Sequence, residues 1–325
     1  MDVDLELYLG VQETSILLMT EETMKFIDIL EAKSIYQEGK NITKYLREKL
    51  DSTGNTSDII EIAYELQTGS YIDDFNSKPQ SYEMYTKDLS EILNSYLISG
   101  DSLLDIGAGE FTTLSLVLNK IDVPLSNVLA LDVSWSRLQK GSEFHAKYSK
   151  TPVLVEPIVA DFKEIPLHSN CVDIVCSSHA LEPNGNDLSK ILAELFRVTK
   201  KKLILFEPSY ELNSKQGRER MDKLGYVKDI EGEAAKLGGR VLDIIPITNR
   251  ITPLNPTACY VIEPPSLKLE HLEFTAFCVP GTDFRLKIDG QFLFSKDTGL
   301  AFPILEEIPI LKGSISYTEM LDKFF

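Results

Sequence analysis

The chain has 325 residues, of which 43% are hydrophobic, so it is long enough for about two globular domains with full cores. Its 50 acidic and 33 basic residues leave a net charge of −17. This charge disfavours a nucleic-acid partner, because such a partner requires a basic face. The first ten residues have no basic start, and no segment reaches the ~20 apolar residues of a membrane span. These features predict an acidic cytoplasmic protein without a membrane partner.

The four cysteines predict neither a disulfide framework nor a metal site. They stand at positions 171, 176, 259 and 278, and no two of them form a CxxC pair. Cys171 and Cys176 flank an apolar run and are expected to be small core residues.

Residues 1–96 are mostly helical in pattern, with a polar linker at 51–58. The second half of this segment, residues 64–96, is rich in tyrosine and phenylalanine. Two interpretations remain open for these aromatic residues. They pack helices against the main domain, or they belong to a lid that closes over a cofactor or substrate.

Residues 97–263 alternate between strand and helix, a pattern that indicates a doubly wound, mostly parallel α/β sheet. Strands are expected at 103–106, 127–134, 153–160, 172–178 and 202–206, and helices at 112–119, 136–148 and 188–198. The apolar runs 241–247 and 258–262 are expected to pair as an antiparallel hairpin.

Residues 264–325 change in character to short strands after Glu263-Pro264-Pro265, which marks a predicted domain boundary. Asp289-Gly290 lies between two apolar runs and predicts a β-hairpin. The sequence therefore predicts a small β-rich domain after the sheet.

A glycine turn follows the strand at 103–106. Gly107 and Gly109 allow a tight turn and close approach of a ligand to the backbone. Three acids, Asp105, Asp132 and Asp161, end successive strands, and the carboxyl ends of parallel strands form the ligand-binding edge of such a sheet. The turn lacks the third glycine of a dinucleotide site. Glu110-Phe111 would suit a pyrophosphate poorly, so a cationic cofactor without phosphate fits better.

Four motifs in order carry a resemblance to a known family. They are DIGAGEFTT (105–113), LALDVS (129–134), VADFKEIPL (159–167) and VDIVCSSHALE (172–182). Over about residues 97–210 the chain resembles class I S-adenosylmethionine-dependent methyltransferases of the small-molecule branch. The resemblance implies a Rossmann-like sheet of seven strands and S-adenosylmethionine as the cofactor.

The resemblance also implies seven cofactor-binding residues at the strand ends: Asp105, Gly107, Gly109, Asp132, Asp161, Phe162 and Ser177. Asp105 and the glycine backbone would hold the methionine end. Asp132 would accept hydrogen bonds from both ribose hydroxyls. Asp161 would accept from the adenine amino group, with Phe162 on the adenine face.

A hydroxyl acceptor would also need a base, and three residues after the fourth and fifth strands are candidates: His179, Glu182 and Glu207. His179 can alternatively orient the loop without taking a proton. The family often has a histidine where this chain has Pro183, so no base is transferred directly. The expected acceptor is a small molecule, such as a sugar or another hydroxylated metabolite.

A second resemblance covers residues 274–312. This segment is similar to the small zinc-ribbon-derived domain that activates some RNA and protein methyltransferases. The similarity lies in Cys278 with Pro280, in the Asp289-Gly290 hairpin and in the run 299–309. Only one cysteine is present, so a four-ligand zinc site cannot form there. The segment is expected to cover apolar surface or to dock a partner.

Two other functions stay open at this stage. The activator-like segment favours an RNA or protein methyltransferase. The net charge of −17 disfavours RNA, and Ser177-Ser178-His179-Ala180 stands where enzymes that methylate amino groups typically have Asn/Asp-Pro-Pro-Tyr/Phe. The departure at Pro183 favours a protein that binds the cofactor without catalysis. A homodimer is also compatible with the sequence.

Overall fold

The computed structural model describes residues 30–251, 255–265 and 276–312. The chain divides into two units, residues 1–66 and 67–325. The smaller unit contains α2 (Ile42–Lys49) and α3 (Ser57–Leu66). These helices share a small apolar core of their own, which includes Ala32, Leu46 and Ile59.

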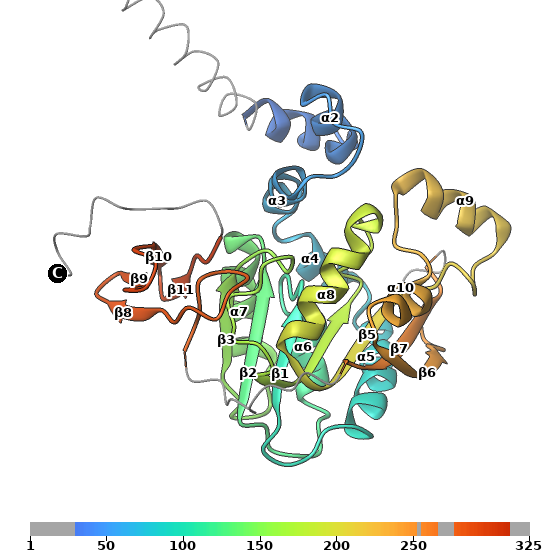
Figure 1. Cartoon of the computed structure of the whole chain (residues 1–325). Coiled ribbons are helices and arrows are strands. Elements are labelled where there is room, and N and C mark those ends of the chain that lie inside the picture. Colours follow the sequence, from blue (N-terminus) through green and yellow to red (C-terminus); the bar gives the residue numbers. More distant parts are fainter. Residues whose placement is uncertain (1–29, 252–254, 266–275, 313–325) are drawn as a thin grey trace, which may run out of the picture. The chain divides into compact units, whose positions relative to one another are not determined.

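The larger unit contains a seven-stranded sheet in the order β3-β2-β1-β4-β5-β7-β6 (Figure 1). Its strands are β1 (Ser102–Ile106), β2 (Asn127–Asp132), β3 (Val155–Val159), β4 (Val172–Ser178), β5 (Thr199–Pro208), β6 (Arg240–Pro246) and β7 (Thr257–Glu263). Neighbouring strands from β3 to β5 are parallel, and β7 is antiparallel to both β5 and β6. The predicted Rossmann-like methyltransferase sheet and its terminal antiparallel hairpin are confirmed.

Helices cover both faces of this sheet. One face carries α5 (Pro79–Asn94), α6 (Thr112–Leu118) and α7 (Trp135–Tyr148), and the other carries α8 (Leu188–Val198) and α10 (Ile230–Lys236). The helix α9 (Lys215–Leu224) lies between β5 and α10 in the chain. Strand β1 is buried throughout, because it is an inner strand of the sheet and lies between the two helix layers.

Helices α4 (Ser70–Ser77) and α5 belong to the larger unit, although the sequence analysis grouped them with the N-terminal segment. Tyr85 of α5 is buried in the same core as α6 and the sheet. Phe75 of α4 makes edge-to-face contacts with Tyr82 and Phe144. These aromatic residues therefore pack the two helices against the sheet domain.

A second, four-stranded antiparallel sheet follows near the C-terminus. It contains β8 (Lys287–Asp289), β9 (Phe292–Phe294), β10 (Ala301–Leu305) and β11 (Ile308–Pro309), in the order β11-β10-β9-β8. The hairpin predicted at Asp289-Gly290 joins β8 to β9. A parallel bridge between Val159 and Ile310 connects this C-terminal sheet to β3, the edge strand of the large sheet (Figure 1). Of the short strands expected in this region, none forms over residues 276–279, where Cys278 makes an isolated antiparallel bridge with Arg285.

No helix within residues 30–251, 255–265 or 276–312 has the length and apolar character that crossing a membrane requires.

Candidate functional site

The predicted site residues gather at one edge of the large sheet, because the parallel strands all end there. Strand β1 lies between β2 and β4, so the strand order reverses on either side of it. Ligands bind beyond the strand ends at such a switch point. The glycine turn, Asp132, Asp161, His179 and Glu207 follow or end β1, β2, β3, β4 and β5 in turn.

The glycine turn is packed so closely that side chains could not replace its hydrogens. Gly107 and Gly109 have φ angles of 64° and 54°, a region that favours glycine. A methyl group on Gly107 would collide with Cβ of Ala180, in the loop after β4. A methyl group on Gly109 would lie 2.5 Å from Nη2 of Arg137. The turn therefore presents bare backbone between β4 and α7.

Asp132 is buried at the end of β2 and is oriented by two backbone donors. The amide of Gly109 donates to its Oδ2 and the amide of Ser134 to its Oδ1, both at 2.9 Å. A carboxylate has about four acceptor positions, so each oxygen can accept a further hydrogen bond. Asp132 is thus a preorganised acceptor for a pair of hydroxyls.

Asp105 lies behind the glycine turn and is also buried. The pKa of its carboxyl is raised to about 7, chiefly by burial; a hydrogen bond from Cys176 opposes the shift, and the nearby carboxylates of Asp132 and Glu207 contribute to it. The sulfur of Cys176 is 3.6 Å from Oδ1 of Asp105. A positive ligand at this edge would relieve the repulsion among these acids.

Asp161 and Phe162 begin the segment after β3, and both are half-buried. The amide of Lys163 donates to Oδ1 of Asp161 at 2.9 Å. The ammonium of Lys163 is 2.6 Å from Oδ2 of Asp187, in the short helical turn before α8. This ion pair joins the segments after β3 and β4.

His179 stands just after β4 with a φ angle of 59°. Its Nδ1 bonds to the carboxylate of Glu182, and its Nε2 lies 2.9 Å from Oγ1 of Thr257 at the start of β7. Burial lowers the pKa of His179, but the charge and hydrogen bond of Glu182, with Glu207, outweigh that effect, so the net shift is upward. Two of the predicted catalytic residues therefore form one pair.

Glu207 is fully buried and holds the loop after β4. Its Oε1 accepts hydrogen bonds from Ser177 Oγ at 2.7 Å and from the amides of Ala180 and Leu181 at 3.1 and 3.2 Å. Burial raises the pKa of Glu207 to about 7. Ser177, predicted to contact the cofactor, is itself buried and donates to Glu207.

The sequence analysis missed a cluster above the glycine turn, formed by Glu110, Arg137 and Tyr71. The carboxylate of Glu110 accepts from the amides of Gly69 and Ile72, at the start of α4, both at 2.9 Å. Nε of Arg137 is 3.7 Å from Glu110, and its guanidinium lies 4.5 Å from the centre of the Tyr71 ring. The charge of Glu110 in an apolar turn was the available signal, but its partners lie about forty residues away in the sequence.

A second set of missed residues surrounds Glu182. Asn255 Nδ2 lies 3.4 Å from its carboxylate, Tyr226 bonds to it, and Arg220 in turn bonds to Asn255 at 2.5 Å. These residues come from α9 and from the segments after α9 and before β7. No local motif marks these residues, since only the fold brings them to Glu182.

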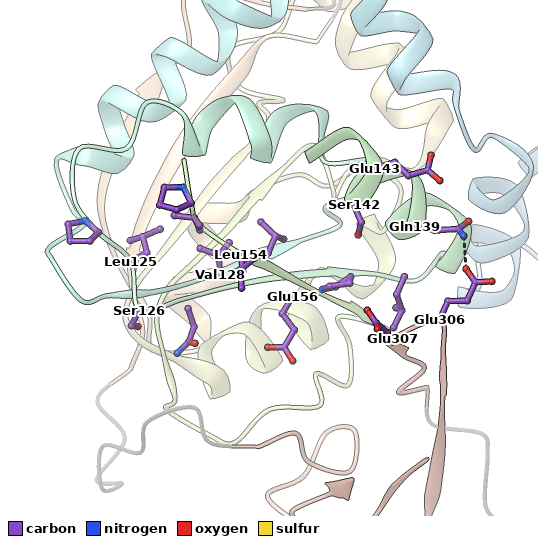
Figure 2. Close-up of a pocket in the computed structure, with 17 residues that line it drawn as sticks. Leu125, Ser126, Val128, Gln139, Ser142, Glu143, Leu154, Glu156, Glu306 and Glu307 are labelled. Atoms are coloured by element: carbon purple, nitrogen blue, oxygen red, sulfur yellow. Dashed lines mark hydrogen bonds between the residues drawn. The ribbon is translucent and has the colours of Figure 1, made fainter. Parts of the chain in front are cut away.

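A separate groove of the sheet domain holds none of the predicted site residues (Figure 2). It measures about 1040 Å³ and lies beside α7, the first residues of β2 and β3, and the turn between β10 and β11. Its charged lining residues are all carboxylates: Glu143, Glu156, Glu306 and Glu307. Within the described residues, no group of three or more histidine, cysteine, aspartate or glutamate side chains is arranged to hold a metal ion.

Residues 104–206 match the protein family described as a methyltransferase domain. These residues form a class I methyltransferase domain. The predicted methyltransferase domain, with S-adenosylmethionine as its cofactor, is thus confirmed for this part of the chain. A comparison with curated protein sequences finds no match.

The methyltransferase domain is similar to several solved structures. Magnesium protoporphyrin IX methyltransferase from Synechocystis PCC 6803, with bound SAH, is 13% identical; the match covers 65% of this chain and 99% of that one, with a TM-score of 0.49. A complex of the Trm112 methyltransferase activator and a methyltransferase from Haloferax volcanii gives 17% identity, 61% and 99% coverage, and a TM-score of 0.47. Geranyl diphosphate C-methyltransferase from Streptomyces coelicolor A3(2) is 12% identical; the match covers 54% of this chain and 78% of that one, with a TM-score of 0.42.

The residues of the methyltransferase site fit its cofactor. Gly107 and Gly109 give the turn its positive φ angles, and the guanidinium of Arg137 lies close to the backbone at Gly109, where a carboxylate could be bound. Asp132 keeps acceptor positions for two ribose hydroxyls. The carboxyl groups of Asp105, Asp132 and Glu207 lie within electrostatic reach of one another, which suits a ligand with positive ammonium and sulfonium groups.

Proposed function

We propose that this methyltransferase methylates a hydroxyl group of a small molecule, with His179 as the proton acceptor. The observation that carries the proposal is the pairing of His179 with Glu182 at the end of β4. The carboxylate orients the imidazole and favours a proton on Nδ1, which leaves Nε2 to accept one. Nε2 lies 2.9 Å from Oγ1 of Thr257, and Glu182 also bonds to Tyr226.

In this proposal the cofactor residues keep the roles that the family resemblance implies. Asp132 holds the ribose, Asp161 and Phe162 hold the adenine, and Asp105 with the glycine turn holds the methionine end. Arg137 adds a cation at the turn, where it would hold the cofactor carboxylate. When bound, the cofactor supplies an electrophilic methyl group on a positively charged sulfur.

The chain's own contribution is alignment, proton transfer and exclusion of water. Neutral His179 removes the proton of the acceptor hydroxyl, and Glu182 stabilises the imidazolium that results. Glu207 is buried and does not reach the crevice, so it acts by fixing the backbone of Ala180 and Leu181. Tyr85 fixes the neighbouring Ser178 through a hydrogen bond of 2.9 Å.

The test measures release of S-adenosylhomocysteine with a panel of sugars and phenols, and with matched amines. His179→Ala should lower kcat on the active hydroxyl compound by at least about 100-fold, the usual contribution of a general base. His145→Ala is the control, since His145 lies on α7 and bonds to Ser115 and to the carbonyl of Val153, away from His179. Unchanged kcat in H179A would remove His179 as the base.

The pH profile gives a second test of the pair. The rate should fall as the pH drops through the pKa of His179, which lies above its ordinary value of 6.5. Glu182→Gln removes the charge that raises this pKa, so the acidic limb should move to lower pH. An acidic limb at the same pH in both proteins would contradict the pairing.

The same assay separates the alternatives. Methyl transfer to RNA or protein, with none to small molecules, would replace this proposal by the second function. Binding of S-adenosylhomocysteine without turnover on any acceptor would favour a non-catalytic protein. A cytoplasmic location and a homodimer stay predictions of the sequence.

A further inference from the structure

The segment that follows β3 has little secondary structure of its own. Residues 160–171 link β3 to β4. The structure describes all of them, and they form turns and bends but no helix. Asp161 and Phe162 stand at its start. A loop without an internal hydrogen-bond ladder needs partners for its backbone, and its position depends on them.

The C-terminal segment, residues 276–312, supplies several of these partners. The amide of Cys278 donates to the carbonyl of Pro166 at 2.9 Å, and the amide of Gly281 to that of Ile165 at 3.3 Å. The amide of Leu311 donates to the carbonyl of Val159 at 2.7 Å, two residues before Asp161. The loop is thus bound to the C-terminal segment at its beginning and at its middle.

Asp283 adds a charged contact to the same loop. Its Oδ1 accepts from the amide of Ser169 at 2.7 Å, and its Oδ2 from the Ser169 hydroxyl at 3.2 Å. Oδ1 also lies 3.3 Å from Nδ1 of His168 and 3.6 Å from Nη1 of Arg197. The hydrogen bonds from Ser169 and the charge of Arg197 outweigh burial and lower the pKa of Asp283.

Apolar contacts reinforce this attachment. Phe302, Leu293 and Leu286 of the C-terminal segment share one buried core with Ile165 and Leu167 of the loop. The loop and the C-terminal segment are thus joined by buried apolar side chains as well as by hydrogen bonds.

The C-terminal sheet also reaches α7, which begins three residues after Asp132. Trp135 Nε1 donates to the carbonyl of Leu305 at 3.3 Å. Gln139 donates to Glu306 at 2.8 Å, the dashed contact in Figure 2. The sheet therefore contacts the elements that follow both Asp132 and Asp161.

We infer that the C-terminal segment, residues 276–312, is a brace that positions the nucleoside half of the cofactor site, with Asp283 as a positioning residue. The inference rests on the placement of ribose at Asp132 and adenine at Asp161 proposed above. An appendage that only covers apolar surface would affect the stability of the fold. A brace also sets the affinity of the folded protein for a nucleoside.

The experiment is titration calorimetry of the full chain with two probes, S-adenosylhomocysteine and 5′-methylthioadenosine. The second probe lacks the amino-acid end but keeps the nucleoside. Asp283→Ala should weaken both probes about tenfold and by the same factor. Asp289→Ala is the matched control, since Asp289 is exposed in the β8–β9 hairpin of the same sheet; its two dissociation constants should stay within twofold of the wild type.

Each outcome decides the inference. Wild-type dissociation constants in D283A, even with a lower binding stoichiometry, would mean that Asp283 affects folding only and would overturn the brace. Should D283A fail to fold, Asp283→Asn keeps the shape of the side chain without its charge and should weaken both probes alike. Asp161→Asn separates the two proposals. If D161N weakens binding of the probes and D283A does not, the brace is overturned. If D161N leaves the dissociation constants unchanged, the placement of the nucleoside is overturned and the brace with it.

Discussion

Glu110 offers the most direct test of how the glycine turn is connected to α4. Its side chain is fully buried, accepts two backbone hydrogen bonds at 2.9 Å from the start of α4, and lies 3.7 Å from Nε of Arg137. Glu110→Ala would remove both hydrogen-bond acceptors. It would also remove the carboxylate that lies beside the buried guanidinium of Arg137. Breaking a buried pair in this way costs about 3–5 kcal/mol.

The assay is chemical and thermal unfolding of the wild type and three variants. For a domain of this size, about 2–4 °C of melting temperature corresponds to 1 kcal/mol, so E110A should melt about 10 °C lower. Arg137→Met should cost less, because Glu110 keeps its backbone donors. The loss of stability in the double variant E110A/R137M should be smaller than the sum of the two single losses by at least about 1 kcal/mol, since both single variants remove the same Glu110–Arg137 contact.

Glu143→Ala is the control for these measurements. Glu143 also forms an ion pair, at 2.9 Å with Lys140, but both side chains are exposed. Its loss should change the free energy of unfolding by less than about 0.5 kcal/mol. A loss below about 1 kcal/mol in E110A, or strict additivity in the double variant, would refute the reasoning.

Two further predictions concern charge at the glycine turn. Arg137→Met should weaken S-adenosylhomocysteine at least about tenfold and leave 5′-methylthioadenosine within about threefold in calorimetry, because only the first probe carries a carboxylate; equal losses would place Arg137 elsewhere. Asp105 has a folded-state pKa of about 7, above its value of about 3.9 in an unfolded chain, so the native state binds more protons between these values and stability falls as pH rises through them. Asp105→Asn should therefore lose less stability than the wild type between pH 5 and pH 8 in urea unfolding, and an equal or larger loss would contradict the shift.

Local pattern was sufficient for the sheet and for the order of its strands along the chain. The run 103–106, the glycine turn and the helix after it obey short-range rules of burial, backbone freedom and periodicity. The position of Asp132 also follows from local pattern, since the carboxyl ends of parallel strands meet at one edge. The Asp289-Gly290 hairpin needed only its two turn residues.

Contacts between distant residues did not follow from local pattern. His179 and Thr257 are 78 positions apart, and Ser169 and Asp283 are 114 apart. Such pairs have no spacing that a helix or strand would impose, so neither the partner of Nε2 nor the role of Asp283 could be read from the sequence. The same applies to Glu110, whose charge was noticed in the turn but whose partners on α4 were not.

The sequence by itself determined that this chain has a methyltransferase sheet with acids at its strand ends, because each strand, turn and acid is encoded within a few neighbouring residues. The tertiary structure alone decided which side chains complete the site. It joined Glu110 to α4 and Arg137, His179 to Thr257, and the C-terminal sheet to the loop after Asp161. These are long-range contacts, and only the packing of the whole sheet domain brings their partners within hydrogen-bond distance.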